Sequence, residues 1–278
     1  MAAKPGSRRE GNPMTATDDE SDRNFVTALA RGLDVLRCFR PHEQSLSNTD
    51  IAQRTGLPKP TVTRLTYTLC QLGYLVHSDS TGFYRLGAGV LQLGYGVLAG
   101  VDLADRARAV MRDLAQGGPN LNVNVALGER HRLTMVYTAV QRTTQNIALS
   151  MTVGARLPLF RSAIGRAALV AMSEADHDRL LRDAAEEGRE DMPAIRAGLK
   201  SACAEYAAQG FVTSFGAWRE QINGIAVPIW SLNGDRLYAM NIGAPTFLAS
   251  ETELRDVYGP KLVAAARGLS DFPKKADR

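Results

Sequence analysis

The chain of 278 residues is longer than most single domains and predicts two modest domains rather than one. Its hydrophobic content of 45% and charged content of 22% are typical of a folded globular protein and exclude a mainly disordered chain. A net charge of +4 is compatible with a polyanionic partner but does not identify one.

The cysteines and the hydropathy of the chain bear on its cellular compartment. Cys38, Cys70 and Cys203 are far apart in the sequence and form no C-x-x-C pair. This pattern favours a reducing cytoplasm over a disulfide framework or a zinc site, so we expect no metal and no cofactor. No apolar run reaches the roughly 18 residues that a membrane span needs, which predicts a soluble, cytoplasmic protein.

The N-terminal part begins with a polar segment and continues with a helical pattern. Residues 1–22 are rich in Gly, Pro, Ser, Thr and charged residues, so they predict a disordered tail. From Asn24 to Arg40, apolar residues recur at spacings of three and four, which predicts an amphipathic helix that Pro41 ends.

Two short helices with a tight turn are predicted next. Ser47 and Asp50 form a capping-box pattern at the start of the first helix, and Gly56 ends it. Pro58 and Pro60 set the start of the second helix.

The second of these helices runs to Leu72 and carries apolar residues at Val62, Leu65 and Leu69. These spacings, with a small residue at Ala52, match two steeply crossing helices, and they predict a helix-turn-helix.

A small hairpin follows this pair of helices. Residues 74–77 and 83–86 flank a polar turn and predict two strands, which would form the wing of a winged helix-turn-helix over 23–87. Between Phe25 and Leu86, seven Lys and Arg face four Asp and Glu, so this segment carries three of the four excess positive charges.

The polar face of the second helix is the candidate DNA-reading surface. Arg64 can donate two hydrogen bonds to a guanine edge, while Lys59 and Thr61 suit phosphate contacts. Arg85 on the wing either contacts phosphate or is solvated. The predicted DNA-binding residues are Lys59, Thr61, Thr63, Arg64, Tyr67, Gln71 and Arg85. The alternative interpretation is an ordinary helical surface used for protein contacts.

Residues 88 to about 116 predict further helix, which we divide into a linker helix over 88–101 and the start of a second domain over 102–273. Leu121–Leu127, Leu133–Tyr137 and Ile147–Val153 are strand candidates. Asn233-Gly234, between two alternating apolar runs (Ile225–Leu232 and Arg236–Ile242), predicts a hairpin turn in which both residues have positive φ.

Helices are interspersed with these strands. We expect them from Ser162 to about Ala171, from the capping pattern at Ser173, from Pro193 to Gln209, and from the capping pattern at Ser250 to about Gly268. Because strands and helices do not alternate strictly, we expect the second domain to contain an antiparallel sheet flanked by helices. We therefore expect the whole chain to have an α+β fold.

Several motifs resemble the IclR family of transcription regulators over roughly residues 25–270. They are Ala28–Leu36, Asp50–Thr61, Arg64-Leu65, Gly73–Leu75, Tyr84–Gly87, Val153–Pro158, Ala163–Ala167 and Gly224–Ile229. The resemblance implies an N-terminal winged helix-turn-helix, a linker helix that dimerises, and a C-terminal effector-binding domain of GAF/PAS-like fold. It also implies homodimers or dimers of dimers on palindromic operators.

The same resemblance implies an effector site in the second domain. Its residues would be Met151, Ser162, Ala163, Ser214, Trp218, Ile222, Asn223, Gly224, Asn241 and Gly243. Trp218 is either a stacking wall for a flat ligand or a residue packed against the sheet. Three arginines are candidates for a positive rim around an organic or aromatic acid: Arg156, Arg161 and Arg166.

Two other functional classes compete with an effector-controlled regulator. An enzyme is disfavoured because the sequence has no nucleophile elbow, Walker loop or His-Glu-x-x-His motif. A DNA-binding regulator without a ligand remains open, and it predicts no thermal stabilisation of residues 102–273 by any acid.

Overall fold

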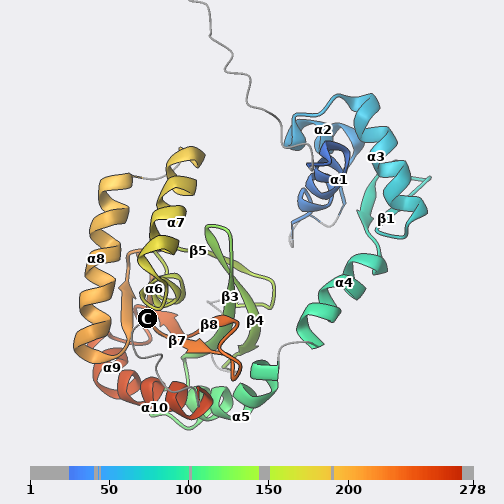
Figure 1. Ribbon diagram of the computed structural model, residues 1–278. Coiled ribbons are helices and arrows are strands. Elements are labelled where there is room, and N and C mark those ends of the chain that lie inside the picture. The colour runs from blue at the N-terminus through green and yellow to red at the C-terminus, as the bar shows by residue number, and fades with distance from the viewer. Residues whose placement is uncertain are drawn as a thin grey trace, which may run out of the picture. The chain divides into compact units, whose positions relative to one another are not determined.

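A computed structural model describes residues 25–40, 43, 45–99, 102–143, 151–188 and 191–270 (Figure 1). The chain divides into two compact units, Met1–Gly96 and Val97–Arg278, here called the N-terminal and C-terminal units. The predicted tail over 1–22 lies outside the described residues. No helix in the described part of the chain has both the length and the apolar character to cross a membrane.

The N-terminal unit is a three-helix cluster followed by a two-stranded hairpin and a further helix. Its elements are α1 (Thr27–Arg37), α2 (Asn48–Thr55), α3 (Lys59–Gln71), β1 (Leu75–His77), β2 (Tyr84–Leu86) and α4 (Ala88–Ala99). Val35, Ile51, Val62, Leu69 and Leu75 form the buried core where the helices and the hairpin meet.

Both ends of α2, including the turn that leads to α3, form as the sequence predicts. The Ser47 hydroxyl accepts from the backbone N–H of Asp50 at 3.2 Å, and the Asp50 carboxylate accepts from the backbone N–H of Ser47 at 2.9 Å. Gly56 ends α2 with φ of +68°, a left-handed conformation that other residues adopt at a cost. The helix-turn-helix prediction is therefore confirmed in its local geometry.

Helix α1 is shorter than the predicted span from Asn24 to Arg40. Val26 is extended, and the helix ends at Arg37 with Cys38 as its C-cap, after which Arg40 forms an isolated bridge with Glu43. Apolar periodicity continues past both ends because Phe25 and Phe39 lie in the flanking chain, so periodicity alone overestimates the length. Pro41 lies outside the described residues.

The predicted wing is present and is tied to the loop before α2. Val76 pairs with Arg85 and His77 with Tyr84 in an antiparallel register. Leu46 exchanges backbone hydrogen bonds of 2.9 and 2.8 Å with Tyr84, so the base of the wing is held against the start of the helix-turn-helix.

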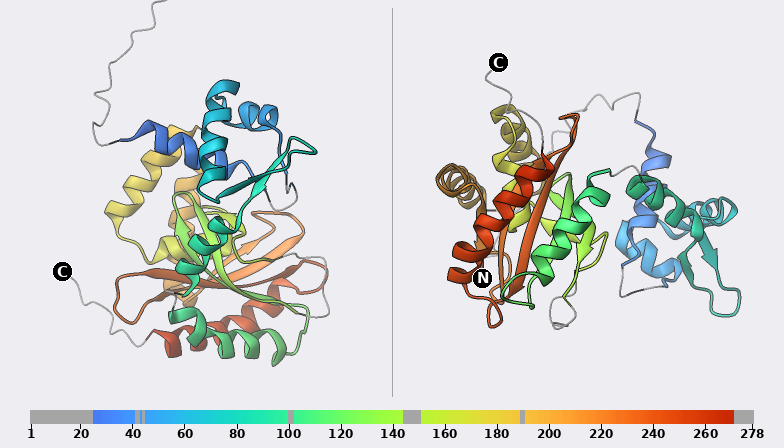
Figure 2. Two further views of the ribbon diagram at one scale, coloured as in Figure 1. Left: turned by 90° about the vertical axis from the view of Figure 1, so that its right-hand side faces the viewer. Right: turned by 90° about the horizontal axis from the view of Figure 1, so that it is seen from below.

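The C-terminal unit is one antiparallel sheet with helices on both faces (Figures 1 and 2). Its strands are β3 (Asn124–His131), β4 (Thr134–Gln141), β5 (Arg156–Pro158), β6 (Val212–Phe215), β7 (Ile222–Trp230) and β8 (Leu237–Pro245). Its helices are α5 (Asp102–Gln116), α6 (Ala163–Val170), α7 (Glu174–Glu187), α8 (Met192–Gln209), α9 (Glu251–Glu253), the π-helical turn η1 (Leu254–Tyr258) and α10 (Gly259–Leu269). The order β5-β4-β3-β8-β7-β6 confirms the predicted α+β fold.

The two faces of this sheet bury different cores. Helices α5 and α10, which lie side by side in Figure 2, pack on the face that carries Val125, Ile225 and Ile242. Helices α6, α7 and α8 pack on the opposite face, where the sheet contributes small residues such as Ala126 and Ala226. The second face can therefore approach its covering helix closely.

Some strand predictions for this unit need correction. The sequence did not predict β5 and β6, and the described part of the candidate Ile147–Val153 is not a strand, since 151–153 form coil and turn. The β7–β8 hairpin forms, but its loop is closed by a bond of 2.9 Å from Ser231 N–H to Arg236 O. Gly234 has positive φ whereas Asn233 does not, because the longer loop needs only one left-handed residue.

Candidate nucleic-acid interface and ligand site

Helix α3 exposes one polar face while its opposite face is buried. Val62, Thr66 and Leu69 point into the core of the N-terminal unit. The exposed face carries Lys59, Thr63, Arg64, Tyr67, Thr68 and Gln71, so five predicted DNA-binding residues share it and the sequence reasoning missed Thr68. Thr61 is half-buried at the start of the helix.

The start of α2 is connected to this exposed face. Asn48 donates from Nδ2 to the Thr63 hydroxyl at 3.0 Å, and that hydroxyl donates to the carbonyl oxygen of Lys59 at 3.0 Å. Asn48 is therefore a positioning residue for the exposed face, and sequence reasoning missed it because the contact depends on how the two helices cross.

Other arginines of the N-terminal unit are engaged in intramolecular contacts. Arg54 contacts Glu43 at 2.7 Å and the carbonyl oxygen of Cys38 at 2.9 Å. Arg37 pairs with Asp34 at 3.1 Å. These contacts distinguish them from Arg64, whose guanidinium has no intramolecular partner among the described residues.

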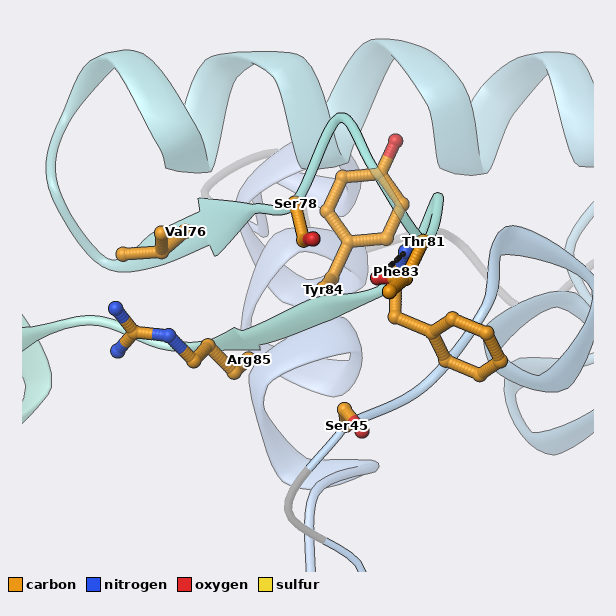
Figure 3. A pocket seen from close by; sticks show the side chains of 7 residues that line it. All are labelled: Ser45, Val76, Ser78, Thr81, Phe83, Tyr84 and Arg85. Atoms are coloured by element: carbon orange, nitrogen blue, oxygen red, sulfur yellow. Dashed lines mark hydrogen bonds between the residues drawn. The ribbon is translucent and has the colours of Figure 1, made fainter.

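A pocket of about 320 Å³ lies beside the wing (Figure 3). Its lining combines four hydroxyl groups, one cation and apolar side chains: Ser45, Val76, Ser78, Thr81, Phe83, Tyr84 and Arg85. In Figure 3 the side chain of the predicted Arg85 extends from β2 toward Val76, and its guanidinium is the charged group of this surface that suits a phosphate backbone.

The three cysteines differ in exposure: Cys38 is buried, Cys70 is half-buried and Cys203 is exposed. All three are free thiols, and burial raises the pKa of Cys38 and of Cys70 above the usual value, which keeps both neutral. Among the described residues, no group of three or more His, Cys, Asp or Glu side chains could hold a metal ion.

The candidate effector residues of the sheet lie mostly on the face covered by α6. In the antiparallel register, Ser214 is opposite Gly224, and Gly224 is opposite Gly243. Directly paired residues present their side chains to the same face, and residues two positions along a strand share that face too. Ile222 and Asn241 therefore belong to the same face as these three.

The N-terminus of α6 lies directly over this part of the sheet. A Cβ on Gly224 would be 3.5 Å from the Cβ of Ala163, so the first turn of α6 touches β7. Ser162 caps the helix by accepting from Gly165 N–H at 3.2 Å. Met151 joins the buried cluster on the same face.

Asn223 does not join the other candidate effector residues. It follows Ile222 on β7, so strand alternation turns it to the face covered by α5 and α10, where its Nδ2 donates to the carbonyl oxygen of Ala249 at 3.2 Å. Its place in the predicted site is a correction, because the prediction placed it by sequence neighbourhood rather than by strand face.

Trp218 and the candidate rim arginines lie in different surroundings. Trp218 is half-buried against the α6-side cluster, and the guanidinium of Arg219 lies 4.6 Å from its ring centroid. Arg166 is not part of a rim: it donates to the carbonyl oxygen of Thr213 at 2.8 Å and pairs with Glu205 at 3.3 Å. Arg156 lines a separate pocket at the β5 edge.

Comparison with known proteins matches both units to one family. Residues 28–79 match the IclR helix-turn-helix domain, and residues 95–271 match the bacterial transcriptional regulator IclR C-terminal domain. The chain is 30% identical over 245 residues to the HTH-type transcriptional regulator TsaQ1/TsaQ2 of Comamonas testosteroni, covering 87% of each chain. It is 28% identical to the Pca regulon regulatory protein of Pseudomonas putida, covering 96% of this chain and 93% of that protein.

Solved structures give the same assignment. An IclR family transcriptional regulator from Brucella abortus superposes with a TM-score of 0.79 and 40% identity, covering 91% of this chain and 95% of that chain. An IclR homologue from Microbacterium hydrocarbonoxydans in complex with 4-hydroxybenzoate shares the fold, with a TM-score of 0.63, 22% identity, and coverage of 87% and 99%. The chain belongs to the IclR family of DNA-binding transcription regulators, and it is not an enzyme.

Proposed function

We propose that the exposed face of α3 enters the major groove of operator DNA, and that a small organic acid bound on the α6 side of the C-terminal sheet changes the affinity for that DNA. The observation that carries the DNA part is the segregation of α3 into a buried apolar face and an exposed face with Lys59, Arg64 and Gln71. In this motif, the N-terminal half of the second helix contacts base edges.

The residues of the α3 face divide by the chemistry of their contacts. Arg64 suits bidentate hydrogen bonding to guanine, whereas Gln71, the last residue of α3, lies outside the half that contacts base edges. Lys59 at the helix start suits phosphate, and so does the wing surface with Arg85 and its neighbouring hydroxyls. Thr63, held by Asn48, is placed to contact either the backbone or a base edge.

A second copy of the chain is the partner that we propose for α4. Apolar side chains of this helix are largely exposed, including Leu91 at 74% and Tyr95 at 69%. A helix of this kind is stabilised by covering it, and a homodimer would present two α3 helices to a palindromic operator. Sedimentation of the full chain is expected to show a dimer or tetramer, and replacement of Leu91 and Tyr95 by Ser is expected to weaken it.

Support for an acid as effector comes from the site and from relatives. The first N–H groups of a helix have no partner within the helix, and an anion at α6 would be stabilised by those of Ala163 and Ile164. A structural relative was solved with 4-hydroxybenzoate, and a relative in Pseudomonas putida is named for the Pca regulon. We propose an organic or aromatic acid as the effector, and the bacterial cytoplasm as the place where operator and effector meet.

Selection of duplex DNA from a random-sequence pool tests the DNA part. The full chain is expected to enrich a partly palindromic motif and to bind it more weakly as salt rises, because phosphate contacts release counterions. Failure to enrich any motif, together with no duplex binding at low salt, would contradict the proposed role of α3.

The effector part is tested on the same selected duplex. Anisotropy titrations with and without organic and aromatic acids are expected to show a changed operator affinity for at least one acid, with thermal stabilisation of the chain by that acid. Unchanged affinity and melting temperature across the panel would favour the ligand-independent regulator instead.

A further inference from the structure

Two buried amides on the α6 side of the C-terminal sheet each leave one polar atom without a partner. Asn124 is 0% exposed and Asn241 is 5% exposed. Among the residues that the structure describes, neither Asn124 Nδ2 nor Asn241 Oδ1 has a hydrogen-bond partner. Nearly all buried polar atoms are hydrogen bonded, so this donor and this acceptor call for a group that supplies both missing bonds.

The unpartnered atom is a donor in one of these amides and an acceptor in the other. Asn124 Oδ1 accepts from the backbone N–H of Thr143 at 3.0 Å, which leaves the donor Nδ2. In Asn241, the atom without a partner among the described residues is the acceptor Oδ1. The site therefore presents one donor and one acceptor rather than two donors.

These two amides are diagonal neighbours on adjacent strands. Asn124 on β3 is opposite Gly243 on β8, and Asn241 is opposite Ala126, so both side chains lie on one face within reach of a common small group. On the other side of Asn241, β7 contributes Ala226. The residues directly paired with the two amides are thus all small.

The serine hydroxyls of the same site are already engaged. Ser162 donates to the carbonyl oxygen of Pro158 at 2.6 Å, and Ser214 donates to that of Arg161 at 2.7 Å. The polar recognition of a ligand here is consequently left to the two amides and to the N–H groups at the start of α6.

The unpartnered donor and acceptor restrict which chemical groups the ligand can carry. An ionised carboxylate only accepts hydrogen bonds, so it suits the start of α6 but cannot satisfy Asn241 Oδ1. A hydroxyl group satisfies both amides, because it donates to Asn241 Oδ1 and accepts from Asn124 Nδ2. We infer that the ligand of this site is an acid that also carries a hydroxyl group, and that Asn124 and Asn241 bind this hydroxyl. This inference rests on the proposed effector function.

Matched pairs of acids test the inference on the full wild-type chain by calorimetry and thermal shift. The pairs are 4-hydroxybenzoate and benzoate, 4-hydroxyphenylacetate and phenylacetate, and malate and succinate, with 4-methoxybenzoate as an acid that has the acceptor but not the donor. In at least one pair, the hydroxylated acid is expected to bind about tenfold tighter or better, because its analogue leaves the amides unpaired. 4-Methoxybenzoate is expected to bind with an affinity close to that of benzoate.

A matched variant is available within the chain. Asn241→Leu removes the acceptor and is expected to bring the ratio of affinities within the responding pair close to one. Asn223→Leu is the control, since Asn223 is also a buried asparagine, 3% exposed with an unpartnered Oδ1, but lies on the opposite face. This variant is expected to keep the wild-type ratio.

The outcomes separate the inference from the proposed function. If acids bind but hydroxylated and plain members do so equally, the inference is wrong and the effector proposal stands. If no acid of the panel binds, the effector proposal is wrong and the inference falls with it. A loss of the ratio in Asn223→Leu but not in Asn241→Leu would also overturn the inference, and the wild-type pairs decide it should Asn241→Leu not fold.

Discussion

Asn48, the first residue of α2, and Thr63, on the exposed face of α3, are joined by a hydrogen bond of 3.0 Å. The bond links the two helices on the solvent side of their crossing, opposite the core contacts of Ile51 and Val62. The position of α3 relative to α2 is therefore fixed by the core contacts on one side and by this hydrogen bond on the other.

Replacing Asn48 by Ala is expected to weaken operator binding and to destabilise the fold only slightly. The lost bond is exposed, so the free energy of unfolding should fall by no more than about 1 kcal/mol. Thr63 loses its lateral partner, and affinity for the selected duplex should fall a few-fold in anisotropy titrations. Unchanged affinity would show that Asn48 does not position the α3 face.

Two glycines of the N-terminal unit are expected to respond to alanine with opposite signs. Gly56 has φ of +68° at the end of α2, so Gly56→Ala should cost about 1 kcal/mol of stability. Gly32 lies within α1 and a Cβ there meets nothing within 4 Å, so Gly32→Ala should gain about 0.5–1 kcal/mol. Chemical denaturation of the full chain measures both, and equal signs would contradict the assigned turn.

The capping box at the start of α2 is expected to make this helix sensitive to acid. Hydrogen bonds from the side chain and backbone of Ser47 lower the pKa of Asp50 below its usual value. A carboxyl whose folded pKa is lowered stabilises the fold above its unfolded pKa of about 3.9, and this stabilisation disappears as the pH falls through the folded pKa.

Titration of the Asp50 carboxyl by NMR checks this prediction. The pKa should lie below about 3.9 in the wild-type chain and should move toward that value in Ser47→Ala, which lacks the side-chain bond. The reverse order of the two values would show that the capping box does not stabilise the charged form.

Glu205 is expected to be essential for the stability of the C-terminal unit. Its carboxylate accepts from the Thr213 hydroxyl at 2.7 Å and pairs with Arg166 at 3.3 Å, and both charged side chains are mostly buried. Glu205→Ala leaves a buried guanidinium without its anion, which should cost about 2–4 kcal/mol. Glu186→Ala, at an exposed position of α7, serves as the control and should stay within about 0.5 kcal/mol of wild type.

The sequence predicted those elements whose structure is determined by interactions between residues close together in the chain. The ends of α2 and the start of α3 followed from Ser47, Gly56 and Pro60, which act on the backbone of their own or neighbouring residues. The edge strands β5 and β6 have three and four residues, too few to show a period, and they form only because β4 and β7 lie beside them.

The candidate sites show the same limit. The α3 face was predictable because helical periodicity separates Arg64 from Val62. The effector site was not fully predictable, since the assignment of Asn223 and Asn241 to opposite faces depends on strand register, and the burial of Arg166 depends on Glu205, which is distant in sequence.

The affinity of Arg64→Ala for the duplex selected by the wild-type chain tests the central claim most directly. Arg37→Ala is the matched control, because Arg37 is also exposed but pairs with Asp34 on α1. The account predicts a loss of about 1–3 kcal/mol in binding for Arg64→Ala, with relaxed preference at one base position, and little change for Arg37→Ala. Wild-type affinity and base preference in Arg64→Ala would contradict it.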